Sequence, residues 1–126
     1  MVIARLEEMS YVDDATFAKN WVAARTHTKV KGPAVIRQEL KAKGIDPETI
    51  ETALSDALLG DKDTQEALAR QAVAKKLPYW EKLPLLSFKK KVYEYLLRRG
   101  FSSSVAMRLV DEYSAKAYNT GRKFDV

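Results

Sequence analysis

Apolar residues recur along this chain at intervals of three and four, the spacing that places side chains on one face of an α-helix. No run alternates apolar and polar residues for long enough to predict a strand. Short polar segments with glycine, proline or a capping residue separate the periodic stretches. The residues expected to cap the starts of helices are Asp13, Asp46, Asp63, Ser87 and Ser102. The sequence therefore predicts an all-α protein.

One segment of this pattern occurs twice, 56 positions apart, at residues 36–46 and 92–102. In each copy, apolar residues four apart are followed by a basic residue, a glycine, an apolar residue and an Asp or Ser. A glycine at this place is typical of a helix that ends with positive φ, which we expect at Gly44 and Gly100. Segments 17–25 and 68–76 also match, but 51 positions apart, so five residues are inserted within 77–86. The chain is thus predicted to be an array of repeats.

The repeats divide the chain into four parts. Residues 1–12 are interpreted as the third helix of a truncated preceding repeat, because their periodicity leads directly into the next unit. Residues 13–60 and 61–118 are predicted to be two complete three-helix repeats, and residues 119–126 a C-terminal tail. Since such units contact mainly their neighbours, we expect tandem helix-turn-helix-like repeats in an elongated, curved array. The chain is interpreted as a fragment, or as a protein with a truncated first repeat.

Composition narrows the class of protein further. The chain has no cysteine, which excludes disulfides and thiolate metal sites, and no apolar run long enough to span a membrane. We therefore expect a soluble, cytoplasmic protein. The net charge of +5 is uneven: residues 1–58 carry −1 and residues 59–126 carry +6. Residues 75–99 contain eight basic residues and only two acidic ones. This excess of positive charge either attracts polyanions or acidic proteins, or simply forms a solvated surface.

The sequence contains no recognisable set of catalytic residues. His27 is the only histidine and has no specific nucleophile or carboxylate partner, so we interpret it as a solvated loop residue. Asp13 and Asp14 stand at an expected helix start, where acidic residues serve capping and the helix dipole. No phosphate-binding glycine loop, zinc-protease helix or calcium loop is present. We expect no enzyme activity, no cofactor and no metal.

Two groups of basic residues are candidate contacts with a partner. On the second helix of the last repeat, Phe88, Val92, Tyr95 and Leu96 share one face and are expected to be core. Basic residues take the opposite side, although Glu94 could simply pair with neighbours three or four positions away. The candidate contacts on this helix are Lys90, Lys91 and Arg98, and those in the preceding repeat are Arg25, Lys29, Lys31, Arg37 and Lys41.

Several other large or charged residues have structural interpretations. Lys43 and Arg99 stand in the last turn of a helix, where a cation complements the helix dipole. Trp21 follows Phe17 by four positions on an apolar face and is expected to be core. Tyr79 and Trp80, in the inserted segment, could stack on bases or anchor a protein contact, but packing over the repeat junction is favoured.

The first repeat resembles a known family. The motifs are Tyr-Val-Asp-Asp at residues 11–14, Phe-Ala at 17–18, Lys-Gly-Pro at 31–33, Ile-Arg-Gln-Glu-Leu at 36–40 and Lys-Gly-Ile at 43–45. They closely resemble RecX, the bacterial regulator of the RecA recombinase. The match is dense over residues 11–56, and residues 62–117, with Leu-Leu-Arg-Arg-Gly-Phe at 96–101, look like the following repeat of that family.

The resemblance implies a specific function. Proteins of the RecX family are tandem three-helix repeats that lie in the groove of the RecA filament on single-stranded DNA. They limit strand exchange and coprotease activity, in DNA recombination, repair and the SOS response, and they are not enzymes. The expected partners are the RecA filament and single-stranded DNA, with no membrane, for a monomeric protein. Two alternatives remain: a sequence-tolerant DNA-binding repeat protein that contacts phosphates, and a helical scaffold with a solubilising basic face.

Overall fold

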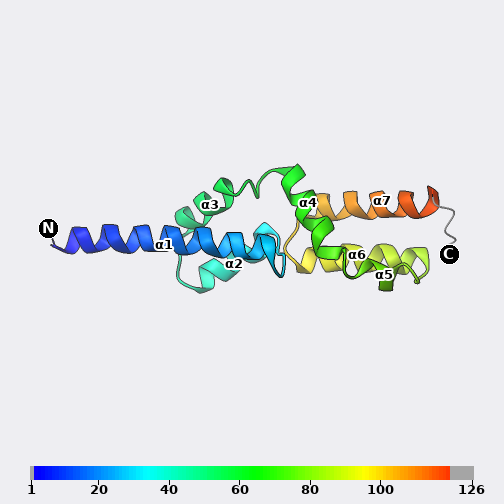
Figure 1. Ribbon diagram of the computed structural model, residues 1–126, viewed down its shortest axis with the longest axis horizontal. Helices are drawn as coiled ribbons and strands as arrows, with labels where there is room; N and C mark the ends of the chain where they lie inside the picture. Colours follow the sequence, from blue (N-terminus) through cyan, green and yellow to red (C-terminus); the bar gives the residue numbers. More distant parts are fainter. Residues whose placement is uncertain (1, 120–126) are drawn as a thin grey trace.

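The computed structural model describes the backbone of residues 2–119 and the side chains of residues 13–116. Every regular element within residues 2–119 is helical, so the all-α prediction is confirmed. The molecule is elongated, with α1 at one end and α6 and α7 toward the other (Figure 1). The predicted tail lies outside the described residues except for Asn119. The helices are α1 (Val2–His27), α2 (Pro33–Ala42), α3 (Pro47–Asp56), α4 (Lys62–Val73), α5 (Leu77–Trp80), α6 (Leu85–Arg98) and α7 (Ser103–Asn119).

The first group of packed helices is formed by α1, α2 and α3. Each of these helices contacts the other two. Ala18 and Val22 on α1 are four residues apart, as are Ile36 and Leu40 on α2, so each pair lies on one helical face. All four side chains are buried. The core of this group contains Ala18, Val22, Ile36, Leu40, Ile45, Ile50, Ala53, Leu54 and Leu59.

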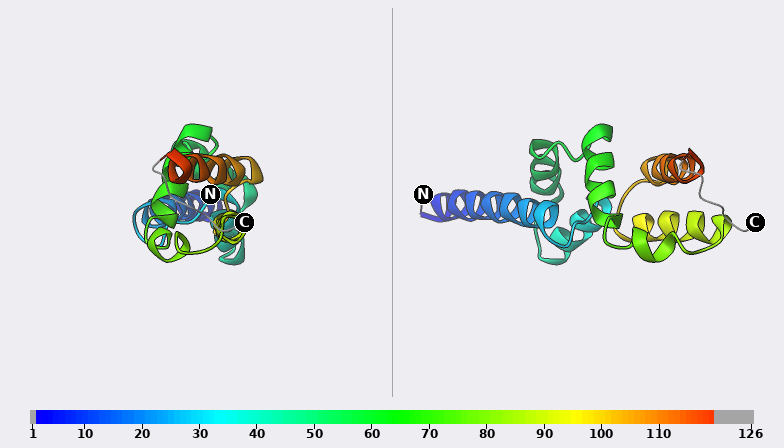
Figure 2. Two further views of the ribbon diagram at one scale, coloured as in Figure 1. Left: turned by 90° about the vertical axis from the view of Figure 1, so that its right-hand side faces the viewer. Right: turned by 45° about the vertical axis from the view of Figure 1, so that its right-hand side comes forward.

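The second group is formed by α4, α6 and α7, with the single-turn helix α5 beside α6 (Figures 1 and 2). The prediction that Phe88, Val92 and Leu96 form core is confirmed, whereas Tyr95 is only half-buried. Val30, from the loop between α1 and α2, also belongs to this second core. The buried members of the core are Val30, Ala69, Val73, Phe88, Val92, Leu96, Phe101, Val105, Ala106, Leu109 and Val110.

Several helix ends follow the sequence prediction. The Asp46 carboxylate accepts a hydrogen bond from the Thr49 amide at the start of α3, and the Ser102 hydroxyl accepts one from the Val105 amide at the start of α7. Gly44 and Gly100 have φ of 86° and 100°. These torsion angles are accessible to glycine without a Cβ penalty, so each glycine ends a helix in the predicted way.

Three predicted caps are wrong. Asp13 lies inside α1, which continues because no glycine or proline interrupts residues 2–27. The predicted boundary between residues 12 and 13 therefore falls within one helix. Asp61, rather than Asp63, caps α4, since its carboxylate accepts from the Thr64 amide at 3.0 Å. Helix α6 begins after Pro84, two residues before Ser87.

A close backbone contact joins the two groups of helices. The Gly32 amide donates to the Arg99 carbonyl at 2.7 Å, and the Ala34 amide donates to the Gly100 carbonyl at 3.1 Å. A Cβ added at Gly32 would lie 2.4 Å from the Gly100 carbonyl carbon, so only glycine fits there. The start of α2 is thereby held against the turn between α6 and α7.

An ion-pair network links α4 to α7. Glu66 is only 5% exposed, and its carboxylate lies 2.8 Å from Nε of Arg108 and 3.8 Å from Arg70. Arg70 in turn donates two hydrogen bonds to Glu112, at 2.9 and 2.8 Å. A buried carboxylate requires such partners, because an unpaired charge in the protein interior is costly.

This network predicts a loss of stability in acid. The hydrogen bonds from Arg70 lower the pKa of Glu112 below its ordinary value. A carboxylate whose pKa is lower in the folded state contributes stability above its unfolded pKa, and that contribution is lost as the pH falls through the folded pKa. We expect Glu112→Gln to unfold more easily than the native protein near neutral pH, with the difference shrinking below about pH 4. Urea unfolding at several pH values measures this.

Asp111→Asn is the matched control, because Asp111 is exposed on the same helix and forms no ion pair among the described residues. It should keep the acid dependence of the native protein. An unchanged free energy of unfolding in Glu112→Gln at neutral pH would contradict the assigned role.

Candidate nucleic-acid interface

A surface hollow of about 360 Å³ lies where the loop between α1 and α2 meets α5 and the second half of α6. Among residues 13–116, its lining carries five cations and two aromatic rings, and no carboxylate or side-chain amide. The charge and size of the hollow suit phosphate groups, which bind cationic side chains. The lining residues are Lys31, Lys76, Trp80, Lys91, Tyr95, Arg98 and Arg99.

Lys91 and Arg98 come from the exposed side of α6, opposite its core face. They are seven residues apart, so the helical repeat places them two turns apart and nearly in line. Both are exposed, and within residues 13–116 no carboxylate lies in ion-pair distance of either. Glu94 instead lies 4.0 Å from Lys90, which does not line the hollow. Lys91 and Arg98 are therefore available to an external anion.

Lys31 reaches this site because the Gly32–Gly100 contact brings the α1–α2 loop to the end of α6. Its amide donates to the Arg25 carbonyl at 3.1 Å, which fixes the backbone of the loop. Burial lowers the pKa of the Lys31 ammonium, and the nearby Arg99 guanidinium lowers it further. The hollow thus concentrates positive charge from both groups of helices.

The aromatic side of the hollow is ordered by contacts within the second group. The rings of Trp80 and Tyr95 meet edge to face, with centroids 5.2 Å apart. Arg99 lies over the Tyr95 ring at 5.0 Å and donates to its hydroxyl at 2.7 Å. Trp80 is half-buried in this arrangement, whereas Tyr79 is 72% exposed and does not line the hollow. The packing expected for both aromatics therefore holds for Trp80 only.

Other sequence-predicted contact residues lie elsewhere. Arg25 pairs with Glu39 at 3.1 Å, and Arg37 pairs with Glu51 at 2.6 Å. Lys41 is exposed on α2, and Lys29 is exposed with a positive φ of 50° in the α1–α2 loop. Of the eight predicted residues, Lys31, Lys91 and Arg98 line one hollow, and the other five do not line it.

Trp21 belongs to one of these outlying clusters rather than to the interior. It is half-buried at the edge of the first core, stacks on Phe17 and donates from Nε1 to Glu39 at 3.1 Å. Arg25 and Lys43 lie over its ring, at 4.8 and 4.6 Å. The prediction of a core tryptophan is therefore wrong, because the indole N–H and both cations keep this edge polar.

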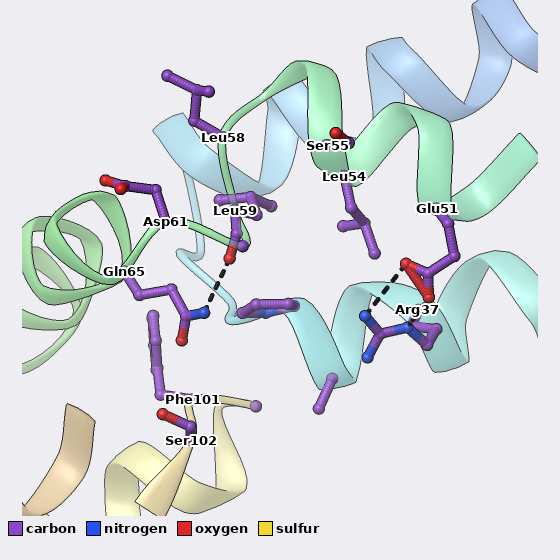
Figure 3. A pocket seen from close by; sticks show the side chains of 14 residues that line it. Arg37, Glu51, Leu54, Ser55, Leu58, Leu59, Asp61, Gln65, Phe101 and Ser102 are labelled. Carbon is purple, nitrogen blue, oxygen red and sulfur yellow. Dashed lines mark hydrogen bonds and ion pairs between the residues drawn. The ribbon is translucent and has the colours of Figure 1, made fainter. Parts of the chain in front are cut away.

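A second pocket, of about 500 Å³, lies on another side of the junction (Figure 3). Leu54, Leu59 and Phe101 supply much of its apolar lining. Its arginine, Arg37, faces Glu51 and is paired with it, as Figure 3 shows. Because its lining carries two carboxylates, Glu51 and Asp61, against the single cation Arg37, this pocket offers less to a polyanion than the basic hollow does.

Sequence reasoning missed Lys76 and Arg99 as members of the hollow. The i,i+4 spacing of Tyr95 and Arg99 was a usable signal, since residues at that spacing are neighbours on a helix. No sequence signal marked the approach of Lys31 to Arg99, because it depends on a contact between residues almost seventy positions apart. The position of Lys76 likewise depends on how α5 folds back beside α6.

The described part of the chain offers neither a cluster of metal ligands nor a membrane-spanning helix. No group of three or more acidic or histidine side chains there is placed to hold a metal ion. None of the described helices combines the length and apolar character that crossing a membrane requires.

Two family models match consecutive segments of the chain. The second three-helix domain of RecX matches residues 13–54, and the third three-helix domain of RecX matches residues 63–110. Together these segments make up more than half of the chain.

Named relatives and solved structures agree with this match. The regulatory protein RecX of Bacillus subtilis is 39% identical over 111 residues, which are 88% of this chain and 41% of the relative. That of Mycobacterium sp. strain JLS is 36% identical over 110 residues, 86% of this chain and 60% of the relative. The chain therefore spans about two fifths to three fifths of the length of these relatives. A crystal structure of RecX from Lactobacillus salivarius superposes with a TM-score of 0.74 at 25% identity, covering 90% of this chain and 72% of that one.

Proposed function

Because the chain belongs to the RecX family, we propose that it binds the RecA filament on single-stranded DNA and limits the strand-exchange and coprotease activities of the recombinase. Its relatives are named regulatory proteins, which supports a role in regulation rather than catalysis. In this proposal residues 1–12 complete a preceding repeat, and residues 13–60 and 61–118 are the two units that contact the filament. The protein acts in the cytoplasm as a monomer.

The observation that carries the proposal is the basic hollow at the junction of the two units. A regulator that binds a filament of protein on DNA needs surfaces for both components. The hollow supplies a cluster of cations for phosphate groups, and the elongated array supplies a long face for a repetitive partner. The contact residues we propose are Lys31, Lys91 and Arg98 in the hollow, together with five residues outside it: Arg25, Lys29, Arg37, Lys41 and Lys90.

Binding of the chain to RecA filaments on single-stranded DNA, compared with binding to the same DNA alone, tests this function. We expect tighter binding to the filament at near-physiological salt, because the filament offers protein contacts in addition to phosphates. Inhibition of strand exchange at the same concentrations should accompany that binding. Equal affinities for the filament and the naked DNA would contradict the proposal.

A second candidate function is sequence-tolerant binding of DNA without the recombinase. The cluster of cations without a carboxylate partner among residues 13–116 favours it. Binding of this kind should weaken steeply as salt rises from about 50 to 200 mM, with a slope set by the number of phosphate contacts. Filament binding that depends much less on salt would favour the regulator.

A further inference from the structure

We propose that the basic hollow binds one nucleotide of single-stranded DNA, with its phosphates on the cations and its base stacked on Trp80. The site would then distinguish a single strand from a duplex. This inference rests on the proposed function, since it names which component of the filament occupies the hollow.

The cations of the hollow surround a space of nucleotide size. Lys31 enters from the α1–α2 loop, while Lys91 and Arg98 stand in line along α6. A volume of about 360 Å³ is at the lower end of the range of about 300–1,000 Å³ found for small-ligand pockets. The hollow therefore fits a single nucleotide, with the adjoining backbone continuing along α6.

Trp80 is placed to receive the base. It lines the same hollow as the cations, remains partly exposed, and makes an edge-to-face contact with Tyr95 that orients its ring. Arg99 already occupies a position over the Tyr95 ring, so Trp80 is the aromatic side chain left for stacking in this hollow. An aromatic ring beside a cationic track is the arrangement that binds single-stranded nucleic acid.

The lining also predicts what the site does not recognise. Its described residues include no carboxylate or side-chain amide, the groups that read adenine and cytosine edges, and its lysines and arginines, which can read guanine, are assigned to phosphates. Stacking accepts every base, because every base has a π-face. In a duplex, those faces are covered by neighbouring base pairs, so Trp80 cannot stack on a base of duplex DNA. The hollow is therefore expected to prefer single strands with little dependence on sequence.

Trp80 fluorescence provides a direct test. Trp21→Phe leaves Trp80 as the only tryptophan of the chain. Titration of this variant with a short oligothymidylate should quench the emission, and titration with a duplex of equal length should not. Trp80→Ala should weaken single-strand binding about tenfold or more and leave duplex binding unchanged, whereas Trp80→Phe should keep most of the affinity.

Tyr79→Ala is the matched control, since Tyr79 neighbours Trp80 but is exposed outside the hollow. It should bind the oligonucleotide like the native chain. Equal losses for single strand and duplex in Trp80→Ala, or native affinity in that variant, would overturn the proposal. So would quenching by RecA without DNA but not by the oligonucleotide, which would assign the hollow to an acidic protein surface.

Filament binding measured in parallel separates this inference from the proposed function. A chain that binds and inhibits filaments without quenching of Trp80 would refute the single-strand site and leave the regulatory function standing. Quenching by oligothymidylate in a chain that fails to bind filaments would support the site and refute the regulator.

Discussion

Replacing Gly32 by alanine is expected to destabilise the protein by roughly 2–4 kcal/mol, the largest effect we predict for a single methyl group. The new Cβ would meet backbone atoms of Gly100 and Phe101 at 2.4–2.6 Å, and backbone cannot move aside as a flexible side chain can. Overpacking of this kind costs about 1–3 kcal/mol. The hydrogen bonds from Gly32 and Ala34 across the junction would be stretched but not lost, at a combined cost of about another 1 kcal/mol. Urea or thermal unfolding measures the loss.

Two other glycines provide controls. Gly60 has no atom within 4 Å of an added Cβ and no positive φ, so Gly60→Ala should change the free energy of unfolding by less than about 1 kcal/mol. Gly44 also has open space but a φ of 86°, so Gly44→Ala should cost only about 1 kcal/mol of backbone strain. If Gly32→Ala were no worse than Gly44→Ala, the junction would not be the close contact described.

The second large effect is expected for charge reversal in the hollow. Lys91→Glu/Arg98→Glu should weaken binding to single-stranded DNA at least about tenfold at moderate salt and lower the slope of its salt dependence by about 1.4, because two phosphate contacts are lost at about 0.7 each. Both side chains are exposed, so folding should be little affected. Fluorescence anisotropy of a labelled oligonucleotide at several salt concentrations measures both quantities.

Lys19→Glu/Lys62→Glu is the charge-matched control. Both lysines are exposed, neither lines the hollow, and the change in net charge is the same. This variant should bind DNA nearly as well as the native chain. Similar losses in both double variants would mean that overall charge, rather than the hollow, governs binding.

Gly32→Ala and Lys91→Glu/Arg98→Glu also test each other. Gly32→Ala displaces the loop that carries Lys31, so any molecules that stay folded should bind DNA more weakly than native protein. Charge reversal leaves the junction intact, so it should lower affinity without lowering the unfolding temperature. Binding and stability are thus separable at this site, although the site includes residues from both groups of helices.

Local features of the sequence predicted much of the fold. The i,i+4 pattern of Phe88, Val92 and Leu96 identified the buried face of α6, because that periodicity follows directly from helix geometry. The glycines at 44 and 100 marked helix ends, since positive φ favours glycine whatever surrounds it. Three cap predictions were wrong because capping depends on the path of the chain as well as on residue type. An Asp or Ser can cap a helix only where the chain leaves the helical path, and residue type alone does not show where that happens.

The helical class, the repeated motif, the family and the excess of basic residues near α6 could all be read from the sequence, because each depends on residue type and short-range spacing. Which cations lie together depends instead on how the two groups of helices pack. Arg25 and Arg37 are paired with carboxylates from other helices, whereas Lys31 is carried to Lys91, Arg98 and Arg99 by the backbone contact between Gly32 and Gly100. Charge is a local property of the sequence, but an anion responds to charges that are close in space, and packing alone sets those distances.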